Sequence, residues 1–73
     1  MSASAPWREL SKALDKCAPG WSWRLATHSR VISYNGKVYR AFPKADDIEF
    51  GHIRSLGRDF GILDCLKKHI QGL

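Results

Sequence analysis

The sequence predicts one α+β domain of two layers, in which helices cover one face of a three-stranded antiparallel sheet. Apolar residues recur at helical spacing near both ends of the chain and with a period of two between them, and an Asn-Gly pair divides the middle segment. We expect the order α-β-β-β-α-α, with residues 1–73 as a single domain and residues 1–5 disordered. A chain of 73 residues has room for one hydrophobic core.

The first helix is expected to begin near Pro6, because proline is tolerated in the first turn, where its missing N–H has no helical partner. Ala18-Pro19-Gly20 ends it, since proline cannot continue the helical hydrogen bonds. The apolar positions of this helix are Trp7, Leu10, Ala13, Leu14 and Cys17.

The middle of the chain predicts three strands. Trp21, Trp23 and Leu25 alternate with polar or small residues, which is typical of a half-buried strand. Asn35-Gly36 then separates residues 30–34 from 37–42, as in a two-residue type I′ hairpin. This turn places Tyr34 opposite Lys37, Ile32 opposite Tyr39, Arg30 opposite Ala41 and Val31 opposite Arg40; which face of the hairpin is buried stays open.

The last part of the chain predicts a loop and two helices. Pro43 ends the third strand, and residues 44–49 form a polar loop in which Asp46 or Asp47 can cap the next helix. The apolar positions of the two helices are Ile53, Leu56 and Phe60, followed by Gly61, and then Leu63, Leu66 and Ile70.

Positive charge is concentrated in the strand region. Of the net charge of +5, residues 19–43 contribute +4, because they contain Arg24, Arg30, Lys37 and Arg40 and no acidic residue. A local field of one sign attracts polyanions, so a nucleic acid or an acidic protein surface is the expected partner. The simpler interpretation is that these residues only keep a small domain in solution.

The two cysteines, Cys17 and Cys65, lie far apart in the sequence and lack the spacing of a metal or redox motif. Each falls on a helix position that suits a small apolar side chain, so we expect buried free thiols, with a disulfide as the alternative. Because the chain shows neither a secretory signal nor an apolar run long enough to cross a bilayer, we expect a cytoplasmic protein without membrane contact.

Several short motifs follow one another in a specific order. Gly20-Trp21 follows the first helix, Ala26-Thr27-His28 follows the first strand, and Pro43 closes the third strand. The stretch Gly51-His52-Ile53-Arg54-Ser55-Leu56 then leads to Phe60-Gly61-Ile62. Over residues 7–62 this order resembles the HicA-type toxins of bacterial toxin-antitoxin modules, and the last stretch, similar to their Gly-Thr-Leu-Arg-Ser-Ile and Ala-Gly-Ile, is the most specific part.

The resemblance implies a small ribonuclease with a fold like that of double-stranded-RNA-binding domains. Such a protein would cleave mRNA without metal or cofactor and would be silenced by a cognate antitoxin. His28 would be the catalytic residue, because imidazole can take up and release protons near neutral pH. The expected RNA-binding residues are Arg24, Arg30, Lys37, Arg40 and Lys44.

The chain departs from that family at two places. Ala26 and Thr27 replace the Gly-Ser or Gly-Gly that usually precedes the family's histidine, and Lys44-Ala45 stands where a second histidine often follows the proline. The alternative function is therefore a non-catalytic binding module, such as a phage or plasmid protein that binds RNA or inhibits a nucleic-acid-handling protein.

Other functional interpretations have simpler explanations. His52 and His69 do not form a recognised zinc spacing with the acidic residues 46–49, so we expect no metal site. A DNA-recognition role for helix 53–60 would use apolar side chains that the core needs. The tryptophans Trp7, Trp21 and Trp23 are expected to pack in the core rather than to stack on bases.

Overall fold

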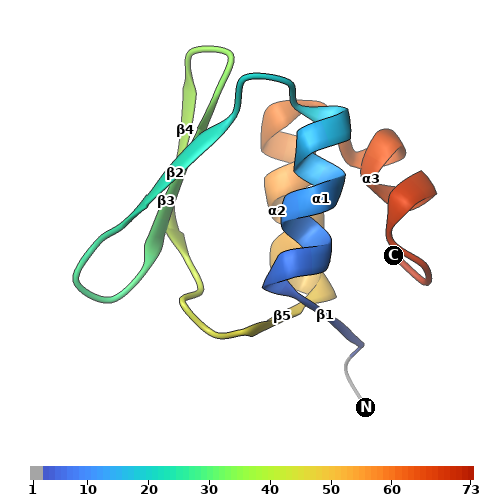
Figure 1. Cartoon of the computed structure of the whole chain (residues 1–73), viewed down its shortest axis with the longest axis horizontal. Helices are drawn as coiled ribbons and strands as arrows, with labels where there is room; N and C mark the ends of the chain where they lie inside the picture. Colours follow the sequence, from blue (N-terminus) through green and yellow to red (C-terminus); the bar gives the residue numbers. More distant parts are fainter. Residues whose placement is uncertain (1–2) are drawn as a thin grey trace.

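The structure is a computed structural model that describes residues 3–73, and its helices lie on one side of a three-stranded sheet (Figure 1). The expected helix, three strands and two helices follow one another along the chain, and two short strands are added to them. The elements are β1 (Ser4–Pro6), α1 (Trp7–Cys17), β2 (Ser22–Leu25), β3 (Arg30–Tyr34), β4 (Lys37–Phe42), β5 (Asp47–Glu49), α2 (Phe50–Phe60) and α3 (Leu63–His69).

The helices supply most of the core, as the apolar spacing predicted. On α1 the buried side chains are those of Leu10, Ala13, Leu14 and Cys17. Helix α2 begins at Phe50, directly after the segment expected to be a loop, and ends where Gly61 adopts a left-handed conformation with φ 70°. The core residues that follow β4 in the chain are Ile48, Phe50, Ile53, Leu56, Phe60, Ile62, Leu66 and Ile70.

Strands β3 and β4 form the expected hairpin. Asn35 and Gly36 both have positive φ, 51° and 78°, as a type I′ turn requires. Tyr34 pairs with Lys37 and Ile32 pairs with Tyr39, which confirms the register next to the turn.

The register changes at the far end of the hairpin, where Arg30 pairs with Phe42 and not with Ala41 as predicted. One extra residue on β4 creates a β-bulge, and Ala41 within it adopts φ 63°, a conformation uncommon for a residue with a Cβ atom. Without the bulge Phe42 would point to the opposite face from Tyr39. With it, Phe42 lies on the helix side and is fully buried.

The expectation of a half-buried first strand is wrong. All four residues of β2 are exposed, with exposed fractions of 41% for Trp23 and 58% for Leu25. Among the elements of residues 3–73, β2 pairs only with β3 and is an edge strand. The fully buried residues of the three-stranded sheet, Ile32 and Phe42, come from β3 and β4.

Strands β1 and β5 form a separate antiparallel pair that the sequence did not predict. Ser4 and Ala5, expected to be disordered, pair with Glu49 and Ile48, whereas Met1 and Ser2 lie outside the described residues. Within the described part of the chain no side chain caps α2, so the expected aspartate cap is wrong, and backbone hydrogen bonds next to this strand pair take its place. The first N–H of α1 donates to the carbonyl oxygen of Asp46 (2.7 Å), and the first N–H of α2 donates to that of Ala3 (3.0 Å).

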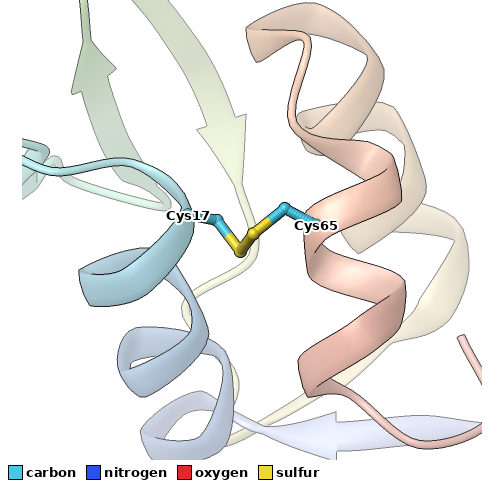
Figure 2. Close-up of a disulfide and its surroundings, with 2 residues drawn as sticks. All are labelled: Cys17 and Cys65. Atoms are coloured by element: carbon cyan, nitrogen blue, oxygen red, sulfur yellow. A yellow bond between two sulfur atoms is a disulfide. The ribbon is translucent and has the colours of Figure 1, made fainter.

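Cys17 and Cys65 form a disulfide, so the expectation of free thiols is wrong (Figure 2). Each cysteine does occupy a helix position facing the core, as the spacing indicated. The packing of α1 against α3 brings their Cα atoms to 5.7 Å, within the range that a disulfide spans. The bond joins the C-terminal end of α1 to α3.

Candidate nucleic-acid interface

The face of the sheet turned away from the helices carries two arginines. Arg24 pairs with Val31 on the central strand β3, and Arg40 lies on β4 next to Tyr39, which is the partner of Ile32. Ile32, the next residue of β3, is fully buried, so Arg24, Val31 and Arg40 share the opposite, outer face. Both arginines are exposed and stand two strand spacings apart, about 9–10 Å.

His28 lies at the same end of the sheet, in the loop that joins β2 to β3 (Figure 1). The N–H of Ala26 donates to the carbonyl oxygen of Ser29 (2.7 Å), which closes this loop. The His28 side chain is exposed and makes no side-chain hydrogen bond within residues 3–73. Its imidazole is therefore free to meet a ligand from solvent.

Lys44 completes this group, because its Nζ donates to the carbonyl oxygen of Thr27, next to His28, at 3.5 Å. We call Arg24, His28, Arg40 and Lys44 the basic end of the sheet. Three cations and one imidazole, all exposed, are suited to holding a phosphate backbone.

Arg30, predicted to bind RNA, does not belong to this surface. Its exposed fraction is 6%, and it lies on the inner face, where Nη1 donates to the carbonyl oxygens of Pro43 (2.7 Å) and Ala45 (3.0 Å). The guanidinium carbon also sits 4.0 Å from the centre of the Trp7 ring. Arg30 thus fixes the segment that follows β4 against α1.

Burial makes the charged form of Arg30 less favourable. Desolvation lowers the pKa of its guanidinium, and the negative charge of Asp46 opposes this shift. The Nε atom is buried, and no atom of residues 3–73 forms a hydrogen bond with it. Arg30 stays charged because an arginine starts from a pKa far above neutrality.

We expect Arg30→Ala to lower the free energy of unfolding by about 2–3 kcal/mol, because it leaves the Pro43 and Ala45 carbonyls without their donor. Arg24→Ala, which removes the same side chain from the exposed face, should change stability by no more than about 0.5 kcal/mol. Urea unfolding of both variants measures the difference. Equal effects would mean that Arg30 is as solvated as Arg24.

Lys37, the other predicted RNA-binding residue outside the basic end, lies at the β3–β4 turn, at the opposite end of the sheet. Its Nζ donates to the backbone carbonyl oxygen of Asp59 on α2 (3.3 Å). Of the five predicted cations, Arg24, Arg40 and Lys44 lie at the end of the sheet that carries His28, whereas Arg30 is buried and Lys37 lies at the other end.

The tryptophans form a cluster at the edge of the core. The Trp7 ring lies 6.1 Å from that of Trp21 and 5.0 Å from that of Trp23. Trp21 Nε1 donates to a carboxylate oxygen of Asp15 (2.8 Å). Trp7 and Trp21 pack against the core as expected, whereas Trp23 stays half open to solvent. An aromatic ring on an exposed edge strand is a feature that sequence reasoning missed, since period-two spacing predicted its burial.

None of the helices within residues 3–73 has the length and apolar character needed to cross a membrane.

Comparisons of the chain with protein-family models, with curated proteins and with solved structures found no significant match.

Proposed function

We propose that this protein binds RNA through the basic end of the sheet and cleaves it without a metal ion, as a HicA-like endoribonuclease acting on mRNA. The observation that carries the proposal is the exposed imidazole of His28 at the same end of the sheet as the exposed Arg24, Arg40 and Lys44. The order of motifs from Gly20-Trp21 to Phe60-Gly61-Ile62 supports the same family and its dsRBD-like fold.

The proposed chemistry needs only these side chains. His28 removes the proton from a ribose 2′-hydroxyl, whose oxygen attacks the adjacent phosphorus, and the bond to the 5′-oxygen of the next nucleotide breaks. A proton then has to reach that leaving oxygen, from His28 or from water. Arg24, Arg40 and Lys44 stabilise the negative charge that grows on the phosphate oxygens. A single imidazole does both proton transfers poorly, so turnover is expected to be slow.

Binding should depend on the outer-face arginines and on salt. We expect the double variant Arg24→Ala/Arg40→Ala to bind a fluorescently labelled single-stranded RNA about 10–100-fold more weakly and to reduce the slope of log affinity against log salt by about 1.4, since two phosphate contacts are lost. Fluorescence anisotropy at several salt concentrations measures both quantities.

The matched control is Lys67→Ala/Lys68→Ala, which removes the same charge from exposed residues of α3. It should leave the affinity within about twofold if contacts at the sheet, rather than net charge, hold the RNA. Equal losses in the two double variants would refute the proposed surface and leave only non-specific attraction.

Cleavage is tested with labelled RNA in EDTA. His28→Ala should lower the rate by about 100-fold or more, whereas His52→Ala, which removes an exposed histidine of α2, should leave it unchanged. A substrate with deoxyribose at the cleaved position should stay intact, because it has no 2′-hydroxyl. Circular dichroism confirms that both variants are folded. Full activity of His28→Ala would remove His28 from the mechanism.

The second candidate is a non-catalytic RNA-binding module, or a module that inhibits a nucleic-acid-handling protein. Two departures from the family favour it: Ala26-Thr27 replace the small residues that usually precede the histidine, and Lys44-Ala45 stands after Pro43 where a second histidine is common. In the experiments above, an RNA-binding module gives intact RNA with salt-dependent binding and leaves bacterial growth unchanged, whereas an inhibitor of a nucleic-acid-handling protein gives intact RNA without needing to bind it.

We place the activity in the cytoplasm, where mRNA is translated. A cognate antitoxin would have to cover the basic end of the sheet, so an acidic contact surface is the proposed chemistry of that partner.

A further inference from the structure

Three side chains with metal-ligating atoms meet where α1 contacts α3. The sulfur atoms of Cys17 and Cys65 and a ring nitrogen of His69 all lie within 4.8 Å of one another. Cys65 and His69 are one helical turn apart and share a face of α3. Cys17 is the last residue of α1 and faces Cys65 (Figure 2). Sequence spacing could not reveal this group, because its members come from both ends of the chain.

We propose that reduction of the Cys17–Cys65 disulfide opens a binding site for Zn²⁺ with Cys17, Cys65 and His69 as ligands. A cytosolic dithiol reductant transfers two electrons and two protons to the disulfide and is itself oxidised to a disulfide. The two thiols then bind one Zn²⁺ as thiolates and release both protons. Three protein ligands leave the fourth tetrahedral position to water, the pattern of zinc sites with an open position.

The distances suit this ion. With Zn–S bonds of about 2.3 Å and a Zn–N bond of about 2.0–2.1 Å, tetrahedral geometry needs about 3.8 Å between the sulfurs and about 3.6 Å from each sulfur to the nitrogen. The nitrogen of His69 is already within 4.8 Å of both sulfurs. The sulfurs have to move apart from bonding distance by less than about 2 Å, which rotation about the cysteine side-chain bonds can supply.

The residues around the two cysteines and His69 favour an ion that binds sulfur, and the group is open to solvent on one side. Cys17 is buried, Cys65 is half-buried and His69 is exposed, so the group opens to solvent on the histidine side. His69 also lines a groove of about 210 Å³ together with Glu9, Lys12, Ala13 and Lys16. The two lysines disfavour an isolated cation, but two thiolates neutralise Zn²⁺. Hard ions such as Mg²⁺ and Ca²⁺ prefer oxygen ligands, so two sulfurs and one nitrogen do not suit them.

The zinc site would be a second way, besides the disulfide, to link α3 to α1. A disulfide is rarely kept in a reducing compartment, so the link between α1 and α3 would be lost there. Zinc bound by the same cysteines restores a link between the two helices. This inference does not depend on RNA binding or cleavage, and its test uses neither.

The test uses the whole protein after its disulfide has been reduced with a phosphine. The phosphine supplies two electrons and becomes a phosphine oxide, and water supplies the oxygen of that oxide and the two protons of the thiols. Co²⁺ is titrated into the metal-free reduced protein, and its thiolate charge-transfer and visible bands report a tetrahedral sulfur site. We expect one Co²⁺ per chain, displaced by one Zn²⁺. The oxidised protein should show no such bands.

His69→Ala should weaken Co²⁺ binding at least tenfold, while His52→Ala, the matched exposed histidine on α2, should leave it unchanged. If the reduced chain is unfolded, circular dichroism should show refolding at one equivalent of Zn²⁺. Absence of the bands in the reduced protein, equal affinity in His69→Ala, or a reduced chain that stays unfolded with Zn²⁺ would each overturn the site.

Discussion

Reducing the Cys17–Cys65 disulfide in EDTA is expected to lower the free energy of unfolding by about 4 kcal/mol. The bond joins residues separated by 48 positions. Closing a loop of that length lowers the conformational entropy of the unfolded chain and so raises its free energy by about 4 kcal/mol. A domain of 73 residues has a total stability of about 4–11 kcal/mol, so this one bond accounts for much of it.

Urea unfolding of the oxidised and reduced protein at the same pH measures this difference without any mutation. Cys17→Ala/Cys65→Ala is the control, because the reductant should have no effect on it. A change below about 1 kcal/mol in the wild type would indicate that the two thiols are free in solution, as the sequence alone suggested.

Phe42→Ala is expected to cost about 3–5 kcal/mol, the range for removing a fully buried phenylalanine side chain. The ring packs beside Trp7 at 6.1 Å, Tyr39 at 5.9 Å and His52 at 6.4 Å between ring centres, so it holds the sheet against both α1 and α2. Its loss leaves a cavity between the two layers, and the variant should be largely unfolded at physiological temperature.

Val38→Ala is the matched control, since Val38 lies on the same strand with an exposed fraction of 50%. It should cost less than about 1 kcal/mol. Thermal unfolding followed by circular dichroism compares the two. A small effect of Phe42→Ala would mean that the sheet and the helices are held together elsewhere and that the bulge at Ala41 does not serve to bury Phe42.

The candidate site was partly predictable. The motif around Ala26-Thr27-His28 identified the histidine, and the absence of acids in residues 19–43 identified the charge. Charge counting cannot tell that Arg30 is buried against Trp7 or that Lys37 lies at the far end of the sheet. A cation on a strand can point to either face, and only the packing of the other layer decides which one.

Sequence by itself determined the local structure of this protein, because local signals act between near neighbours. Asn35-Gly36 determined the hairpin turn, apolar spacing determined the helices, and Gly61 ended α2. Only the tertiary structure decided that β1 pairs with β5, that the bulge buries Phe42, and that Cys17 meets Cys65. Each of these depends on contacts between residues that are distant in the chain. Local sequence patterns do not predict the free energy of such contacts.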